Sequence, residues 1–211
     1  MKYNYVAIEG NIGSGKTSLA KMIASDFDAR LILERFEDNS FLPKFYKDPE
    51  KYAFPLEMSF LADRFQQLKI DIGSHDLFKS FTIADYFIDK SLIFAKKTLQ
   101  NDEFVLYNKL FEIIISTLPK PDLILFLYTS TEQLKRNILS RGRSYELNIE
   151  SSYLEKIQSG YFEYFRTHIR ETVLIVDTHK MDFVKEKSDY LKIISLLEGD
   201  FGKGIYRITF D

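Results

Sequence analysis

The residues with the clearest chemical signature lie near the start of the chain. Residues 10–18 match the pattern G-x-x-x-x-G-K-[ST] directly after the apolar run 5–8. This order predicts a phosphate-binding P-loop, in which glycines let backbone N–H groups surround a phosphate and the next helix adds its positive dipole end. The pattern assigns Lys16 to the β/γ-phosphates and the Thr17 hydroxyl to Mg²⁺. The predicted nucleotide-binding residues are Gly10, Asn11, Ile12, Gly13, Ser14, Gly15, Lys16, Thr17 and Ser18.

A candidate catalytic carboxylate follows the second apolar run. Glu34 comes directly after residues 31–33, and the loops at the carboxyl ends of parallel strands collect the ligand site in α/β folds. A carboxylate at that edge could accept the proton of a hydroxyl that attacks the γ-phosphate of ATP. A glutamate that ends a strand is more often a surface residue, so the hypothesis depends on the residues around Glu34.

The elements that must position these residues alternate between strand and helix. Apolar runs predict strands at residues 5–8, 31–33, 80–83, 123–128 and 173–177. Helical spacing predicts helices at residues 16–25, 52–72, 90–99, 102–117, 130–141, 151–170 and 182–197. This alternation predicts an α/β fold, a three-layer P-loop sandwich whose five-stranded parallel sheet carries helices on both faces. The length of 211 residues favours one domain, 1–211.

The composition excludes several classes of protein. Acidic and basic residues are interspersed and give a net charge of −2, which argues against a broad basic face for nucleic acid. The chain has no cysteine, which excludes disulfides, thiolate metal sites and cysteine nucleophiles. No apolar run approaches the ~20 residues that span a bilayer, and no signal peptide is recognisable. We therefore expect a soluble, cytoplasmic protein that binds small phosphate-bearing molecules, without membrane or nucleic-acid partners.

Further groups of residues form a set that is more specific than a P-loop alone. They are Glu34 to Leu42, Phe45 to Pro49, Tyr52 to Glu57, Arg141-Gly142-Arg143-Ser144-Tyr145-Glu146, and Tyr153-Leu154-Glu155 with Tyr161. With the P-loop they span about four fifths of the chain. In this order they resemble the deoxynucleoside kinase family, especially its bacterial deoxypurine branch. The resemblance implies an ATP- and Mg²⁺-dependent enzyme that phosphorylates the 5′-hydroxyl of a 2′-deoxynucleoside, with a purine favoured, and a lid at about residues 139–148.

The resemblance also implies roles for individual residues. Glu34 matches the general base that takes the proton of the 5′-hydroxyl. Tyr46 and Glu146 match a pair that hydrogen-bonds the 3′-hydroxyl of the sugar. Arg141 and Arg143 match catalytic lid arginines that close over the phosphates and offset the charge of the transferring group. A homodimer formed through helices of the middle segment is implied as well.

The base is expected to contact Glu57, Phe60, Arg64 and Phe94. Glu57 stands where most of the family carries glutamine, and an ionised glutamate only accepts hydrogen bonds, which suits the N1–H and N2–H₂ edge of guanine. Arg64 lies two helical turns further on the same face, where we expect it to keep Glu57 ionised. Phe94 matches an aromatic residue that stacks on the base, and Phe60 is expected to line the same cleft. Phenylalanine at helical spacing is otherwise more often part of a core.

One segment departs from the family. After its third strand the family carries an acidic residue, an arginine and a serine or threonine, whereas this chain reads Ala84-Asp85-Tyr86-Phe87-Ile88-Asp89-Lys90-Ser91. Asp85 is expected to serve Mg²⁺ through water. The arginine is missing, and Lys90 is a flexible point charge that cannot reproduce a guanidinium fork. Because the match can slip by one residue here, the roles of Asp85, Asp89 and Lys90 stay open.

Two other functions stay open as well. Ala62-Asp63-Arg64 is similar to a triplet of thymidylate kinase, but the segment after the second strand lacks that enzyme's Glu-Pro-Gly-Gly turn. The third strand is not followed by Asp-Arg-Tyr either. The chain could also be a non-catalytic, nucleotide-binding subunit, which would need no base at Glu34.

Overall fold

The computed structural model describes residues 2–36, 39–73, 79–168 and 170–210. The strands are β1 (Tyr5–Gly10), β2 (Arg30–Ile32), β3 (Thr82–Ala84), β4 (Leu123–Tyr128), β5 (Thr172–Asp177) and β6 (Gly204–Thr209). The helices are α1 (Lys16–Asp26), α2 (Leu42–Phe45), α3 (Pro49–Gly73), α4 (Lys90–Thr98), α5 (Asn101–Ile115), α6 (Thr131–Arg141), α7 (Ser151–His168) and α8 (Lys187–Glu198).

The strands form one parallel sheet in the order β2-β3-β1-β4-β5-β6. In its centre Gly10 of β1 lies beside Leu127 of β4, so the P-loop leaves the sheet from the middle of its carboxyl edge. β1 has β3 on one side and β4 on the other, because the chain first builds β2 and β3 on one side of β1 and then crosses to β4 on the opposite side. Such a switch point leaves a crevice at the carboxyl edge, which is where α/β sheets bind their ligands.

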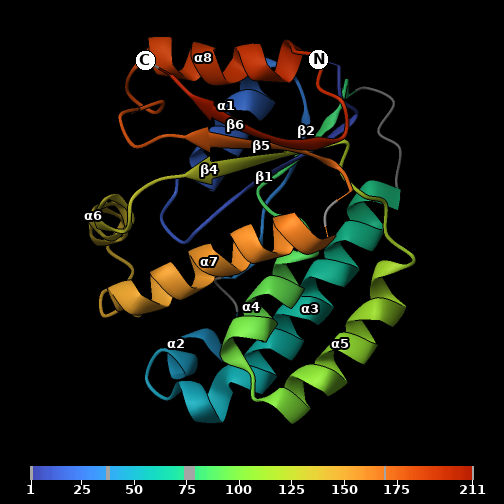
Figure 1. Cartoon of the computed structure of the whole chain (residues 1–211), viewed down its shortest axis with the longest axis vertical. Coiled ribbons are helices and arrows are strands. Elements are labelled where there is room, and N and C mark those ends of the chain that lie inside the picture. The colour runs from blue at the N-terminus through green and yellow to red at the C-terminus, as the bar shows by residue number, and fades with distance from the viewer. Residues whose placement is uncertain (1, 37–38, 74–78, 169, 211) are drawn as a thin grey trace.

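Helices cover both faces of this sheet (Figure 1). Val6 and Ile8 of β1 pack in a core shared with α1 and α8. Ala7 points the other way, because successive strand residues face opposite sides, and it packs with Phe126 and with Tyr161 of α7. Below α7 in Figure 1, α3, α4 and α5 form a further helical group. The molecule thus has a sheet with its P-loop above and a helical group below, and the loops between them can form a site.

The α/β class, the parallel sheet and the helices on both faces are confirmed, but the described residues form a sheet of six strands, so the predicted number of five is wrong. The additional strand, β6, pairs with β5 at the edge of the sheet. Its residues alternate between half-buried and exposed, so it lacks the buried apolar run that marks the other strands. The short helix α2 was not predicted either, because a single turn carries no periodic signal. No helix in the described ranges is long and apolar enough to cross a membrane.

Candidate active site

The P-loop connects the end of β1 to the start of α1. Gly13 and Gly15 have φ angles of 83° and 91°, which glycine adopts without steric cost. The side chain of Lys16 folds back over the loop, and its Nζ donates to the backbone oxygens of Gly10 and Asn11, both at 2.8 Å. Burial lowers the pKa of Lys16 to about 8, and the charge of Lys90 adds to the shift. A cationic group is therefore already held inside the loop.

Two helices hold the P-loop in place from outside. Asn11 Nδ2 donates to the backbone oxygen of Leu154 in α7 at 2.7 Å, and Asn137 Nδ2 in α6 donates to the backbone oxygen of Gly13 at 2.8 Å. The sequence analysis did not single out Asn137. It lies one helical turn before Arg141 and therefore on the same face of α6, which is the signal that could have found it.

Glu9 is a buried carboxylate beneath the loop that the sequence analysis also missed. Its Oε1 accepts hydrogen bonds from the backbone N of Gly10 and from the hydroxyl of Tyr161, both at 2.9 Å. Its Oε2 accepts from the backbone N of Phe87 at 3.4 Å, and burial raises its pKa. A glutamate within a strand that is buried along its whole length is unusual, and that contrast could have drawn attention to it.

Asp85 joins the P-loop to the candidate base. It is the first residue after β3, and its Oδ2 accepts from the Thr17 hydroxyl at 2.5 Å while its Oδ1 accepts from the backbone N of Glu34 at 2.7 Å. Asp89 turns instead toward α7, where it accepts from the hydroxyl of Tyr164. The structure therefore separates the two aspartates. A hydroxyl and a carboxylate beside a P-loop are oxygen ligands of the kind that Mg²⁺ binds.

Two cations hold the carboxylate of Glu34. Arg64 donates to Oε1 from Nε at 2.8 Å and from Nη2 at 2.6 Å, and Lys90 Nζ lies 2.6 Å from Oε2. Burial raises the pKa of Glu34, but Lys90 and Arg64 outweigh burial and lower the pKa to about 2. Lys90 therefore brings a second positive charge to the candidate base, although the family's arginine is missing. The sequence analysis had left this role open.

The surroundings of Glu57 differ from the expectation. The guanidinium of Arg64 bonds to Glu34, and its Nη1 also donates a hydrogen bond to the hydroxyl of Ser91 at 2.7 Å. Within the described residues Glu57 forms no ion pair, and its Oε1 accepts from the Thr98 hydroxyl at 2.9 Å. Burial raises the pKa of Glu57 to about 7, against the opposing influences of Arg64 and Thr98. Arg64 therefore favours the ionised form of Glu57, as expected, but it forms no ion pair with Glu57 and its influence is outweighed by burial.

The predicted lid begins where α6 ends. Gly142 ends the helix in the left-handed conformation, with a φ angle of 72°. Arg141 and Arg143 both donate to Glu146, which is buried. The guanidinium of Arg143 also lies 3.9 Å from the ring centre of Phe36. The two arginines expected on the phosphates thus pair with the glutamate expected on the sugar in this structure.

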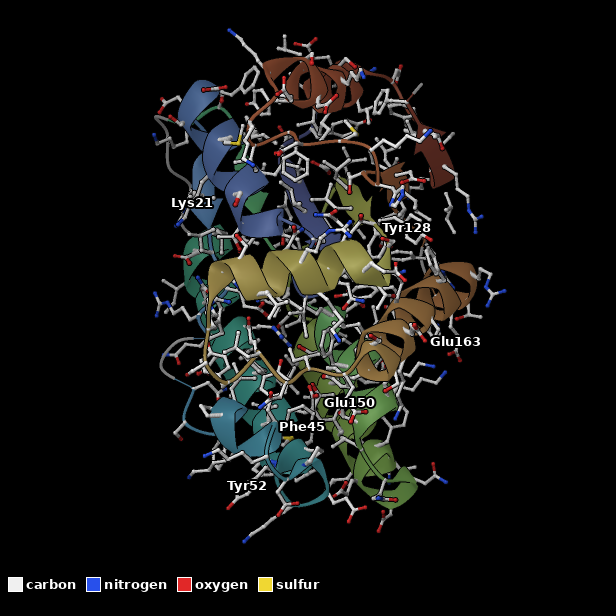
Figure 2. The ribbon with its side chains drawn as sticks, turned by 90° about the vertical axis from the view of Figure 1, so that its left-hand side faces the viewer. Lys21, Phe45, Tyr52, Tyr128, Glu150 and Glu163 are labelled. Atoms are coloured by element: carbon white, nitrogen blue, oxygen red, sulfur yellow. The ribbon has the colours of Figure 1, made fainter. Side chains whose placement is uncertain are left out.

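One cleft collects all the residues expected to bind the acceptor. It has a volume of about 770 Å³, is open to solvent, and includes Asp85 but not Asp89. Figure 2 shows α6 crossing between the sheet and the helical group, with Phe45 below it. The expected residues that line the cleft are Ile12, Gly13, Lys16, Thr17, Glu34, Tyr46, Glu57, Phe60, Arg64, Asp85, Phe94, Arg141, Arg143 and Glu146. The cleft is also lined by Lys90, whose role the sequence left open, and by residues that were not predicted, Phe36, Leu42, Phe45, Leu56 and Tyr153.

A second cleft adjoins the first on the other side of the P-loop. The two clefts share Gly13, Lys16, Thr17, Arg141 and Arg143, so these residues form their border. The second cleft is otherwise lined by Ser14, Gly15 and Ser18 of the P-loop segment, by α6 and by the segment that follows β5. Gln133 and Asn137 of α6 line it, as do Thr178, Met181, Asp182 and Phe183. The last four were not predicted because the segment after β5 carries no motif.

Comparisons with known proteins agree with this geometry. The family model described as deoxynucleoside kinase matches residues 6–200. A deoxyguanosine kinase of Bacillus subtilis (strain 168) is 42% identical over 195 residues, which cover 90% of this chain and 93% of the relative. A deoxyadenosine/deoxycytidine kinase of the same organism is 30% identical over 164 residues, 76% of each chain.

The solved structures add a likeness in fold. A deoxyadenosine kinase from M. mycoides with bound dATP has a TM-score of 0.80 at 24% identity, covering 92% of this chain and 98% of that one. These matches do not favour thymidylate kinase or a non-catalytic subunit. The chain belongs to the deoxynucleoside kinase family and is therefore an ATP-dependent phosphotransferase that acts on deoxynucleosides.

Proposed function

We propose that this kinase transfers the γ-phosphoryl group of MgATP to the 5′-hydroxyl of a purine 2′-deoxynucleoside, deoxyguanosine or deoxyadenosine. The position of Glu34 carries the proposal. Asp85 bonds both the backbone of Glu34 and the hydroxyl of Thr17, so the candidate base lies beside the phosphate-binding loop. A hydroxyl that contacts Glu34 is then placed next to the phosphates, and such placement supplies much of the catalysis in phosphoryl transfer.

The donor side fits a nucleoside triphosphate. The P-loop lies at the N-terminus of α1, with Lys16 folded over it, and this arrangement favours the binding of phosphates. Thr17 would hold Mg²⁺ directly and Asp85 would hold it through water. When bound, the ion neutralises charge on the phosphates. We assign the adenosine end to the second cleft, which extends from the P-loop along α6.

On the acceptor side, Glu34 binds and orients the 5′-hydroxyl. With a pKa of about 2 it is a weak base in the free cleft, so its proton transfer follows the formation of the new bond rather than preceding it. The hydroxyl replaces part of the contact that Lys90 or Arg64 makes with the carboxylate. The displaced cation remains close enough to stabilise negative charge on the transferring group.

We assign the sugar and the phosphates to a lid at about residues 139–148, within one domain that covers 1–211. Tyr46 and Glu146 both line the acceptor cleft, where they can bond the 3′-hydroxyl. Arg141 and Arg143 line both clefts, at the border that these share with Lys16 and Thr17 of the phosphate loop. Phosphates compete for these arginines with Glu146, so binding of the donor releases Glu146 to bond the sugar.

A purine is favoured by the relatives, and aromatic side chains of the cleft suit a flat base. The relative that is 42% identical is a deoxyguanosine kinase, and its match covers nearly all of both chains. Phe60 and Phe94 line the cleft beside Glu57 and offer flat apolar surface to a base.

A panel of the four natural deoxynucleosides with MgATP tests this function. We expect the highest kcat/KM for a purine deoxynucleoside. Thymidine monophosphate serves as the discriminating control, because turnover of the monophosphate without turnover of any nucleoside would contradict the proposed acceptor. A preference for a pyrimidine deoxynucleoside would agree with the proposed reaction but contradict the proposed preference for a purine.

We also propose a homodimer that uses the middle segment. Helix α5 exposes Val105, Leu106 and Ile113, with 54%, 51% and 70% of their surface accessible, and such a row of apolar side chains is suited to a protein contact. A second copy of the chain would cover it. Light scattering should then give about twice the 24.8 kDa of one chain.

A further inference from the structure

Thr98 faces Glu57 at the base end of the acceptor cleft. It lies at the end of α4, and its Oγ1 is 2.9 Å from Glu57 Oε1 and 3.0 Å from the backbone oxygen of Phe94. A hydroxyl carries one proton, so Thr98 can donate to only one of these two acceptors at a time. Which acceptor it chooses depends on whether Glu57 is charged.

The pair has two hydrogen-bond patterns. When Glu57 is ionised, the charge-assisted bond is the stronger one, so Thr98 donates to Glu57, and the carboxylate presents only acceptors to the cleft. When Glu57 is protonated, the neutral acid can donate to a base in the cleft while its other oxygen still accepts from Thr98. It can also donate to Thr98, whose own proton then turns to the Phe94 oxygen.

We propose that Thr98 and Glu57 together select between purine bases through the position of one proton. The ionised pair accepts from N1–H and N2–H₂ of guanine, whereas the protonated acid offers the donor and the acceptor that match the amino group and a ring nitrogen of adenine. This inference rests on the function proposed above, because it needs a deoxynucleoside in the cleft. Thr98 is a positioning residue, since it acts on the base through Glu57.

Charged and titratable groups from several elements surround Glu57: Arg64 on α3, Lys90 on α4, Glu34 after β2, Tyr46 after α2, Tyr107 on α5 and Tyr153 on α7. Burial raises the pKa of each tyrosine, so all three stay neutral near pH 7. Glu34, with a pKa of about 2, stays ionised. Burial raises the pKa of Glu57 to about 7. Of the carboxyl and phenol groups in this set, Glu57 therefore changes charge near neutral pH.

The test compares kcat/KM for deoxyguanosine and deoxyadenosine on the same enzyme between about pH 5.5 and 8.5. Ionisation of Lys16, Glu34 or ATP changes both kcat/KM values by the same factor, because these groups serve both substrates alike. Their effects therefore cancel in the ratio. We expect the ratio of kcat/KM for deoxyguanosine to that for deoxyadenosine to rise by about tenfold or more with pH, because deoxyguanosine gains one hydrogen bond to a charged carboxylate. The midpoint should lie near the pKa of Glu57, about 7.

Three variants assign the effect to the pair. Glu57→Gln cannot ionise, so its ratio should not change with pH. Thr98→Val removes the donor that stabilises the carboxylate, so the midpoint should move to higher pH, by about one unit. Thr98→Ser keeps the hydroxyl and should restore the native midpoint, which a loss of packing alone would not predict. If Thr98→Val does not fold, Thr98→Ala removes the same hydroxyl with a smaller side chain.

Several results would overturn the inference. They are a native ratio that does not depend on pH, a pH dependence that persists in Glu57→Gln, and a hydroxyl-free variant with the native midpoint. Failure of the proposed function looks different, because the enzyme would then phosphorylate neither deoxynucleoside at any pH. That result would overturn both proposals together.

Discussion

The donor side and the acceptor side of this site are built in different ways. On the donor side, backbone groups of one short segment, residues 10–18, surround the place of the phosphates, and Lys16 bonds to that segment's own carbonyl oxygens. On the acceptor side, the contacts join side chains that lie far apart in the sequence. Glu34 follows β2, Arg64 lies in α3 and Lys90 begins α4. The first arrangement is local, and the second exists only in the folded chain.

The two sides also treat charge differently. On the acceptor side each carboxylate is already paired with two cations, Glu34 with Arg64 and Lys90, and Glu146 with the lid arginines. A substrate must exchange part of such an ion pair for a contact of its own. We therefore expect the acceptor side to be most sensitive to changes of charge, and the donor side to changes that disturb the backbone.

The largest effect should come from removing the carboxylate of the acceptor side. In Glu34→Ala we expect kcat to fall by about 10²–10⁴-fold, the usual loss for a missing acid–base group, while ATP binding persists because the P-loop is unchanged. Arg64 and Lys90 lose their buried partner, and the free energy of unfolding should fall by about 3–5 kcal/mol. Steady-state kinetics, ATP titration and chemical denaturation measure these three quantities.

Glu163→Ala is the matched control for this change. Glu163 also pairs with two cations, Lys96 and Lys97, but it lies half-exposed on α7 outside the cleft (Figure 2). Exposed pairs contribute little, about 0–1 kcal/mol, so kcat and stability should stay near the native values. An unchanged kcat in Glu34→Ala would show that another group, or none, takes the proton.

A smaller effect should follow from disturbing the backbone of the donor side. A Cβ added at Gly10, where φ is +152°, would lie 2.7 Å from the backbone oxygen of Leu127 and 2.6 Å from Ser14 Oγ. Because the backbone of β4 cannot yield easily, the loop must shift. We expect Gly10→Ala to lower kcat by about 10²-fold, as misplacements near 1 Å do, to weaken ATP binding, and to leave deoxynucleoside binding intact.

Gly202→Ala controls for the added methyl group, since its Cβ would approach no closer than 3.7 Å to any side chain, the nearest being Tyr206. Calorimetric titration with each substrate separates the two affinities. Equal losses for ATP and the deoxynucleoside in Gly10→Ala would contradict the separation of the two sides.

The smallest effect should come from removing one of the two cations at Glu34. An opposite charge at this distance lowers a carboxyl pKa by about 1–3 units, so Lys90→Met should raise the pKa of Glu34 and move the acid limb of kcat/KM to higher pH. The native pKa of about 2 keeps Glu34 ionised at neutral pH. The stability that its ion pairs contribute is present above the unfolded pKa and is lost as the pH falls through about 2.

Lys90→Arg retains the charge and should leave the acid limb in place, and Lys97→Met controls for the loss of a lysine outside the cleft. The measurement is kcat/KM against pH for all three variants. An acid limb in Lys90→Met that coincides with the native one would mean that Arg64 alone holds the carboxylate.

Much of the donor side could be predicted from the amino-acid order. Strand, glycine loop and helix follow one another within residues 5–26, and the local backbone brings Lys16 and Thr17 to one place. The buried apolar runs likewise predicted the class of fold and five of its strands. β6 was not predicted, because an edge strand with one exposed face has no continuous run of apolar residues.

The partners on the acceptor side were decided by tertiary structure alone. Helical spacing correctly placed Arg64 and Glu57 on one face of α3. Arg64 nevertheless bonds to Glu34, an ionised carboxylate that follows β2 in the sheet. Likewise, Asp85 rather than Asp89 accepts a hydrogen bond from Thr17, because the end of β3 lies against the P-loop in the folded chain. Side-chain pairs of this kind depend on how helices and strands that are distant in sequence come to lie against each other. The spacing of residues along the chain specifies neighbours within an element, but the contacts between elements arise only when they pack.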